Sequence, residues 1–166
     1  MSFPNSDVDH RIAEALKKYA DVVYRVCFLY MRNKADIDDI FQEVFLKLMK
    51  RSTPFENEEH EKAWLIKVAA NQCKDALKNF WRSKVDFVDI FESPAEEPAD
   101  NDLLNMVISL PQKYKEVIYL YYYEDYTVPE ISKILNRKEN TIYSDLHRGK
   151  ALMKQRLGGT ADEYAN

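Results

Sequence analysis

The chain has 166 residues, a formal net charge of −4 and only three glycines. So few glycines, in a chain with helix-length runs of Leu, Lys, Glu and Ala, exclude an ordinary sheet protein, which needs more turns. No stretch approaches the roughly 18 consecutive apolar residues of a membrane helix, and the first residues lack the pattern of a signal peptide. We therefore expect an all-α protein that works in the cytoplasm.

The sequence contains no cluster of residues suited to catalysis or metal binding. Its two cysteines, Cys27 and Cys73, lie within helical patterns and not at metal-ligand spacing, and its three histidines are scattered. We expect both thiols to be reduced and to lie in or near a core. We accordingly predict no metal, no other cofactor and no catalytic residue, so the chain is not expected to be an enzyme.

The negative charge is concentrated in one segment. Residues 85–102 contain seven acids and no base. Residues 62–84 carry six bases against one acid, and residues 133–156 carry seven against two, so each of these segments has a net charge of +5. Two basic segments on either side of an acidic one are typical of two nucleic-acid-binding regions joined by a linker.

Three helices are predicted before the acidic segment. The first covers about residues 7–31 and the second about residues 35–50, and both carry apolar residues three or four apart. The third covers about residues 58–83, and Asn57 can cap its first turn.

These three helices are expected to form a compact domain of residues 1–84. Their apolar stripes include Leu16 in the first helix and Phe41 in the second. Residues 85–102 then form an acidic flexible linker. Some of its residues are apolar and would favour a surface to lie on, namely Val85, Phe87, Val88, Ile90 and Phe91.

The third predicted helix carries a polar ridge along its exposed face. Its members recur at intervals of three or four residues, which places them on one side of a helix. Lysine and arginine can neutralise phosphates, while an asparagine offers paired donor and acceptor groups to a base edge. The ridge is therefore a candidate DNA-binding surface, and it consists of Lys67, Asn71, Lys74, Lys78 and Arg82.

Two further helices are predicted after the linker, at residues 103–110 and 112–123, with Pro111 between them. Thr127 and Glu130 then have the spacing of a capping box, which indicates the start of a short helix. Several tyrosines surround this region. We expect them to pack against the neighbouring helices with their hydroxyls reaching solvent: Tyr119, Tyr121, Tyr122, Tyr123 and Tyr126.

The short helix is followed by a tight turn and a longer basic helix. Asn136 can end the short helix in the left-handed conformation, and the longer helix runs to about Leu157. This order predicts a helix-turn-helix motif in a domain of residues 103–158, with residues 159–166 as a tail. The second helix should enter the major groove with Asn140, Thr141, Tyr143, Ser144, His147, Arg148 and Lys150.

Three stretches, taken in this order, resemble the extracytoplasmic-function sigma factors, the smallest members of the sigma-70 class. They are residues 36–47, residues 63–78, and residues 110–117 followed by 127–157. The resemblance implies two small helical domains, sigma region 2 in the N-terminal half and sigma region 4 in the C-terminal half. It also implies that the chain carries RNA polymerase to promoter DNA.

The resemblance further implies a role for each surface. Acidic and amide residues of the second helix would dock on the clamp helices of the polymerase largest subunit, with the beta flap as a second contact. The ridge of the third helix would read the minus-ten element, and the second helix of the motif would read the minus-thirty-five element. The implied clamp-binding residues are Asp38, Asp39, Gln42 and Glu43.

The loop before the third helix has two interpretations. In the family it forms part of a pocket for an unstacked base, so Phe55 could stack on that base. Phe55 could equally be a lid on the core. The groove-facing helix also departs from the family, because Tyr143 and Asp145 stand where basic residues are usual. Asp145 could accept a hydrogen bond from cytosine or pair with a neighbouring basic side chain.

Other classes of protein remain as alternatives. A helix-turn-helix regulator that acts without polymerase would need one DNA surface and a dimer helix, but the chain has two basic ridges and no sustained heptad. A nucleic-acid enzyme would need a carboxylate or His-Cys cluster. An adaptor without DNA contacts is disfavoured by the ridges. Within the family, an anti-sigma factor is a further partner that the exposed helix faces permit.

Overall fold

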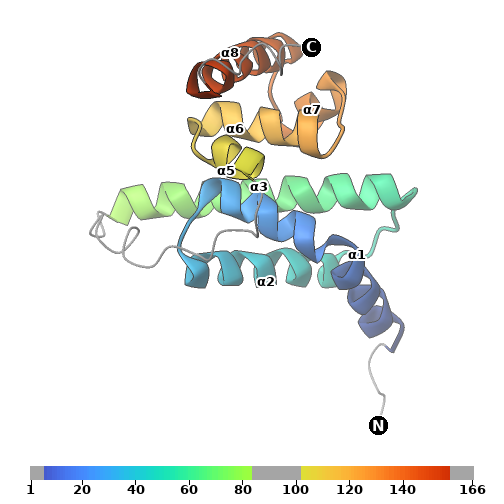
Figure 1. Ribbon diagram of the computed structural model, residues 1–166. Coiled ribbons are helices and arrows are strands. Elements are labelled where there is room, and N and C mark those ends of the chain that lie inside the picture. The colour runs from blue at the N-terminus through green and yellow to red at the C-terminus, as the bar shows by residue number, and fades with distance from the viewer. Residues whose placement is uncertain (1–5, 84–101, 158–166) are drawn as a thin grey trace. The chain divides into compact units, whose positions relative to one another are not determined.

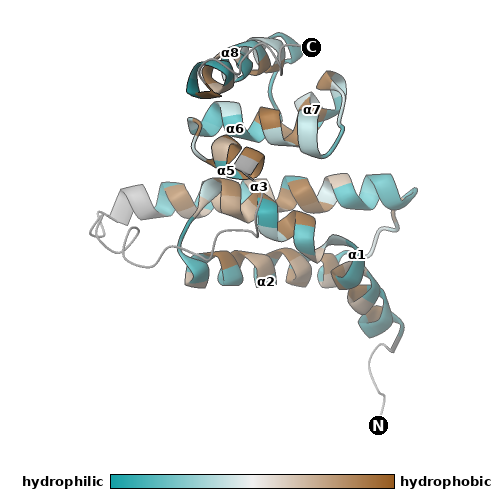
Figure 2. Cartoon of the chain, viewed as in Figure 1, coloured by the Kyte–Doolittle hydropathy of each residue, from teal (hydrophilic) through white to brown (hydrophobic). Residues whose placement is uncertain are grey.

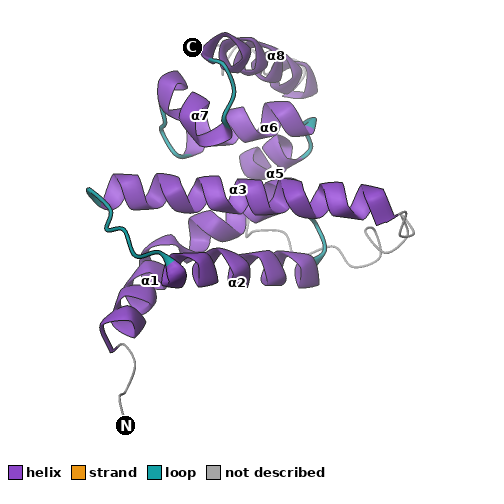
Figure 3. Ribbon diagram, turned by 180° about the vertical axis from the view of Figure 1, so that it is seen from behind, coloured by secondary structure: helices purple, strands orange, loops and turns teal. Residues whose placement is uncertain are grey.

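The computed structural model describes residues 6–83 and 102–157 (Figure 1). Every secondary-structure element within these two ranges is a helix, which confirms the expected all-α fold (Figure 3). The chain divides into two compact units, residues 1–96 and 97–166, and each folds around its own core. Nearly all of the predicted linker and the whole predicted tail lie outside the described residues.

The N-terminal unit is a bundle of three helices, α1 (Ser6–Tyr30), α2 (Lys34–Lys50) and α3 (Glu58–Ser83), and each packs against the other two. The predicted helices match these bounds closely. Apolar residues line the faces that the helices turn toward one another, while polar residues cover the outer faces (Figure 2). Cys27 and Cys73 are both buried and neither forms a disulfide, which confirms the expected core thiols.

Two residues expected in this core lie elsewhere. Leu16 is exposed, because Ala15 takes the buried position in that turn of α1. Phe41 is only half-buried, because Ile40 lies deeper. Where two apolar residues are adjacent in a helix, their side chains point about 100° apart, so small rotations of the helix decide which one is covered.

Polar side chains secure the ends of the helices in this unit. The Asn33 side chain accepts from the Ala35 amide at 2.9 Å at the start of α2, and Asn57 accepts from the His60 amide at 2.8 Å at the start of α3. The second of these bonds confirms the predicted cap. At the other end of α2, Arg11 donates to the carbonyl of Leu48 at 3.2 Å, so α1 adds a side-chain bond to the one that this oxygen accepts from the Arg51 amide.

Tyr19 and Lys18 tie α1 to the start of α3. The Tyr19 hydroxyl donates to the Glu58 carbonyl at 3.3 Å. Burial, with smaller contributions from Glu61 and Glu58, raises the pKa of Tyr19 to about 12. The Lys18 ammonium lies 2.6 Å from the Glu58 carboxylate, and this hydrogen-bonded pair raises the pKa of Lys18 and lowers that of Glu58.

The C-terminal unit begins with α5 (Asp102–Ile108) and α6 (Gln112–Ile118), and the predicted interruption at Pro111 is confirmed. The predicted helix 112–123 is confirmed as one continuous helical stretch, but its second half is not α-helical. Residues Tyr119–Tyr123 form a π-helical turn, η1, in which the amide of Glu124 donates to the Tyr119 carbonyl at 3.3 Å. The wider turn stacks the Tyr119 and Tyr123 rings, with their centroids 5.5 Å apart.

The helix-turn-helix follows as α7 (Val128–Leu135) and α8 (Glu139–Leu157), as predicted. The capping box is complete, because the Thr127 hydroxyl accepts from the Glu130 amide at 3.4 Å and the Glu130 carboxylate accepts from the Thr127 amide at 3.2 Å. Asn136 ends α7 with φ 53° and ψ 51°, the left-handed conformation that was predicted.

Helix α8 approaches α6 closely at Gly149. A Cβ atom at this position would lie 2.9 Å from Cγ1 of Ile118, a buried branched side chain. Glycine therefore removes a steric obstacle between the two helices. This close packing determines the distance between α8 and α6.

The turn at Asn136 provides a test of this architecture. We expect Asn136→Ala to lower the free energy of unfolding of the C-terminal unit by about 1 kcal/mol, because a Cβ without a polar group disfavours the left-handed region. Asn136→Gly is the matched control and should be neutral or stabilising, since glycine adopts this conformation freely. Urea unfolding followed by circular dichroism measures both. Equal losses for the two variants would show that the side chain matters and the backbone conformation does not.

Candidate nucleic-acid interface

The acidic and amide residues of α2 all lie on its exposed face. Asp38, Asp39, Gln42 and Glu43 are exposed, while Ile37, Ile40 and Val44 on the opposite side of the helix are buried. Asp36 belongs to the same acidic turn, where partial burial and then the charge of Asp39 raise its pKa. Nothing in the N-terminal unit covers this acidic face, so its four side chains are accessible to a partner.

The polar ridge of α3 lies opposite the buried face of that helix. Lys67, Asn71 and Lys78 are exposed, and Lys74 is half-buried. The side chain of Arg82 lies outside the described residues. The buried face includes three residues with no more than 1% exposure, Ile66, Ala70 and Cys73. Their burial determines the rotation of α3 and so directs the ridge toward solvent.

An aromatic cluster occupies the loop before α3. Phe55 is half-buried, and the Arg51 guanidinium lies 4.2 Å from the centre of its ring. The Trp64 ring lies 5.6 Å from Phe55, and the His60 ring packs edge-on against it at 5.2 Å. Arg51 also donates to the carbonyl of Thr53 at 2.9 Å. The loop is therefore held by its own side chains, with the Phe55 ring partly accessible.

The candidate residues of α8 fall into more than one group. Asn140, Thr141, Ser144 and Arg148 are exposed and line one open polar hollow between α8 and the start of α6, hereafter the α6–α8 hollow. The hollow also includes Lys113, for which the sequence pattern gave no indication because the residue precedes the motif.

The other three candidates of α8 lie apart from this hollow. Tyr143 is 58% exposed and lines a separate hollow with Tyr121 and Tyr122. His147 is exposed. Lys150 is half-buried and borders an apolar pocket, so the structure does not group it with the residues of the α6–α8 hollow.

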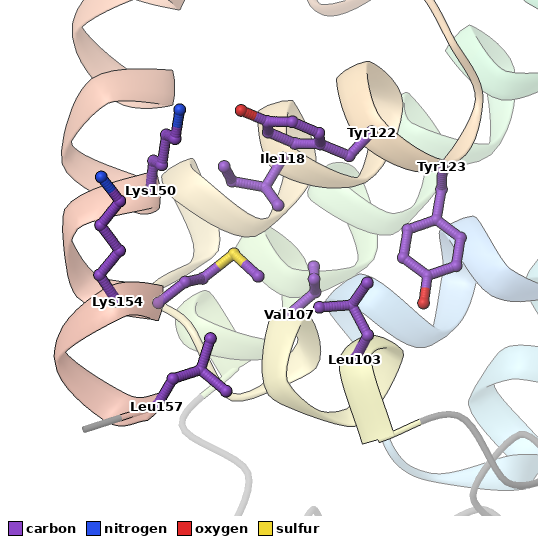
Figure 4. A pocket seen from close by; sticks show the side chains of 9 residues that line it. Leu103, Val107, Ile118, Tyr122, Tyr123, Lys150, Lys154 and Leu157 are labelled. Carbon is purple, nitrogen blue, oxygen red and sulfur yellow. The ribbon is translucent and has the colours of Figure 1, made fainter. Parts of the chain in front are cut away.

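The apolar pocket lies between α5, α6, η1 and α8. Figure 4 shows Lys150 and Lys154 along the α8 side of this pocket, with Leu103 and Val107 of α5 across from them. Its remaining lining is mostly apolar or aromatic and comprises Ile118, Tyr122, Tyr123, Met153 and Leu157. A pocket of this composition favours apolar side chains.

Asp145 takes the second of the two roles considered for it. Its side chain is buried and its carboxylate accepts from Arg137 at 3.0 Å, so it pairs with a basic side chain within the unit. The same guanidinium donates to the carboxylate of Glu116 on α6 and pairs with it. Gln112 donates to the other Glu116 oxygen at 3.2 Å. Arg137, Glu116 and Asp145 form one ionic group, hereafter the Arg137 triad.

The tyrosines follow the packing interpretation only in part. Tyr119 and Tyr126 are buried, whereas Tyr121 and Tyr122 are exposed. The expectation that the hydroxyls reach solvent is wrong for Tyr119, whose hydroxyl donates to the Glu124 carboxylate at 2.7 Å, and for Tyr123 and Tyr126, whose hydroxyl oxygens are buried. Glu124 directly follows the π-helical turn that Tyr119 begins, so the turn separates the hydroxyl from its acceptor by five residues.

Comparison with known proteins matches each unit to a family. Residues 15–83 match the model "Sigma-70 region 2", and residues 100–153 match "Sigma-70, region 4". The sigma factor SigV of Bacillus subtilis (strain 168) is 32% identical over 138 residues, which cover 81% of this chain and 83% of SigV. The ECF sigma factor SigW of the same organism is 25% identical over 167 residues, covering 87% and 88%.

A solved structure shows the same fold. The sigma factor RpoE from Bartonella quintana, crystallised in complex with the anti-sigma factor NepR, matches with a TM-score of 0.70 and 17% identity, covering 89% of this chain and 96% of that one. These matches define a transcription initiation factor that consists of a sigma region 2 and a sigma region 4. The chain belongs to the extracytoplasmic-function group of RNA polymerase sigma factors.

None of the helices within residues 6–83 and 102–157 is long and apolar enough to cross a membrane. In the same part of the chain, no three His, Cys, Asp or Glu residues are grouped as metal ligands would be.

The Arg137 triad leads to a prediction about stability. Replacing Arg137 by Met leaves the buried carboxylates of Glu116 and Asp145 without their cation. Breaking a buried pair in this way costs about 3–5 kcal/mol, and the partial exposure of Arg137 reduces our expectation to about 2–3 kcal/mol.

Lys133→Met is the matched control for this prediction. Lys133 is an exposed lysine of α7, and its replacement should change the free energy of unfolding by less than about 0.5 kcal/mol. Urea unfolding of both variants checks the difference. A loss below about 1 kcal/mol for Arg137→Met would contradict a structural role for the triad.

Proposed function

We propose that this sigma factor binds core RNA polymerase and directs it to specific promoters, with α3 recognising and helping to open the minus-ten element and α8 binding the minus-thirty-five element. One observation carries the proposal: each unit exposes its own polar, partly basic helix face, turned away from its core. Two such faces on one chain suit two separate DNA elements, whereas a single-site regulator needs only one.

The ridge of α3 supports minus-ten recognition through its chemistry. Lys67 and Lys78 are exposed cations suited to phosphates, and Asn71 between them can pair with a base edge. Arg82 and Lys74 extend the same series along the helix. The Phe55 ring, partly accessible beside Trp64, offers a stacking surface for a base that leaves the duplex.

The acidic face of α2 is the proposed contact with the clamp helices of the polymerase largest subunit. Four exposed polar side chains without a structural task are available there for charge-complementary docking. The apolar pocket of the C-terminal unit is the surface proposed for the beta flap, because apolar burial supplies much of the affinity at the centre of an interface. We also propose the cytoplasm as the place of action, because both contacts are with core polymerase.

An anti-sigma factor is also a proposed partner. In one similar structure the sigma factor RpoE is bound to the anti-sigma factor NepR, and in another CnrH is bound to the cytosolic domain of CnrY. In this chain the acidic face and the apolar pocket are the surfaces such a partner would have to cover in order to compete with polymerase.

Run-off transcription with core polymerase on a genomic fragment library tests the main proposal. We expect start sites that require the added chain, and a shared sequence upstream of them. Their absence, together with failure to form a stoichiometric complex with core polymerase, would favour the alternative of a helix-turn-helix regulator that acts alone.

The acidic face gives a prediction that separates binding from folding. We expect Asp39→Lys and Glu43→Lys each to weaken core polymerase binding at least about tenfold. A positive side chain then replaces a negative one in a contact proposed to depend on charge complementarity. The free energy of unfolding should change by less than about 0.5 kcal/mol, since both side chains are exposed. Asp21→Lys, an exposed acid of α1, is the control and should bind polymerase normally. Fluorescence titration with core polymerase distinguishes the three variants.

The ridge of α3 gives a prediction about specificity. Asn71→Ala should relax sequence preference in the minus-ten element and cost about 1–3 kcal/mol against the preferred base, as expected for a lost base contact. Lys67→Ala should instead weaken binding to all sequences alike, since a phosphate contact carries no sequence information. Transcription from a set of minus-ten variants measures both. Equal, sequence-independent losses for the two variants would remove Asn71 from the list of base-reading residues.

A further inference from the structure

The α6–α8 hollow contains three cations in two different situations. Arg137 directs its guanidinium at Glu116 and Asp145, and its side chain is only 21% exposed. Lys113 and Arg148 line the same hollow, and no carboxylate of the described residues lies within ion-pair distance of either. One cation is therefore bound within the protein, while two remain available to a ligand.

Arg137 also links the two elements that carry the available cations. Besides its two carboxylate partners, its guanidinium donates to the carbonyl of Lys113 at 3.4 Å. Glu116 and Lys113 belong to α6, and Asp145 belongs to α8, so a single side chain joins the helices across the hollow. The position of Lys113 relative to α8 depends on this link.

We infer that the DNA-binding surface extends beyond the helix-turn-helix to Lys113, which contacts a backbone phosphate, and that Arg137 positions this extension without touching DNA. The inference rests on the proposed function, because it needs α8 to lie in a major groove. Asn140, Thr141 and Ser144 line the hollow beside the two cations and supply neutral donors to the same anion.

The geometry of a helix in the major groove supports a phosphate at this place. Phosphates border the groove on both sides, so a cation on a neighbouring element beside the groove-facing helix meets the backbone and not a base. Lys113 is exposed and lines the hollow, and its ammonium lies 5.0 Å from the centre of the Tyr114 ring. Lysine then acts as a point charge toward the phosphate.

Salt dependence tests the phosphate contact. Holoenzyme assembled from core polymerase and the full chain is titrated with a duplex promoter fragment at several salt concentrations. Lys113→Ala should reduce the slope of log affinity against log salt by about 0.9. The factor by which wild type binds more tightly than the variant should therefore be about threefold smaller at 200 mM salt than at 50 mM. The loss should be the same for a fragment with a scrambled minus-thirty-five element.

Lys17→Ala is the matched control, since Lys17 is an exposed lysine of α1 outside every surface assigned to DNA. It should leave the slope unchanged. An unchanged slope for Lys113→Ala would overturn the phosphate contact. If wild-type holoenzyme itself does not form or does not distinguish the scrambled fragment, the proposed function fails instead, so the two failures are separable.

A charge exchange tests the role of Arg137 as a positioning residue. Arg137→Ala alone should weaken promoter binding, and the unfolding of the unit could account for that loss. The double variant Arg137→Asp with Asp145→Arg keeps a guanidinium beside Glu116 and restores the pairing. We expect it to bind the promoter fragment within about threefold of wild type with an unchanged salt slope. A slope reduced by about 0.9 in the double variant would show that Arg137 contacts a phosphate itself, and would overturn the positioning role.

Discussion

Each helix of a small bundle buries one apolar face. The direction of that face decides which side chains stay exposed, and the other features of this structure depend on it. In the N-terminal unit, Ile66, Ala70 and Cys73 of α3 are buried in the core, which leaves Lys67 and Asn71 on the exposed side of the helix. In α2, burial of Ile37 turns its acidic residues outward in the same way. Because apolar burial supplies most of the free energy of folding, the exposed faces that we propose to bind partners have no structural task, and their residues can vary.

The C-terminal unit follows the same rule with an added constraint. Its first two helices are only seven residues long, so little apolar surface is available to hold α8. Gly149 compensates by allowing close packing on Ile118, and the Arg137 triad adds an ionic link between α6 and α8. The π-helical turn lies between α6 and α7 and begins with the buried Tyr119, whose hydroxyl donates to the carboxylate of Glu124 directly after the turn. The orientation of α8 thus depends on a few well-defined contacts.

Sequence patterns predicted the features that local chemistry determines. The caps at Asn57 and Thr127 and the left-handed turn at Asn136 were predictable, because each depends on residues close together in the chain. Features that depend on distant residues were not. The partner of Asp145 lies eight residues away and shares its guanidinium with Glu116 on another helix, so no periodicity indicates it. Leu16 and the π-helical turn were misjudged for the same reason, since tertiary packing overrides a local pattern.

The Arg137 triad also bears on how this factor can be re-engineered. Exchanging α8, the helix proposed to bind the minus-thirty-five element, for that of a relative is a direct way to redirect promoter choice. Such a graft would follow the bounds of the helix, Glu139–Leu157. Arg137 lies outside those bounds, while Asp145 lies within them. A graft that brings a basic residue to position 145 would place two cations against one buried carboxylate at Glu116. A graft that preserves the triad therefore has to begin at Arg137 and include the turn as well as the helix.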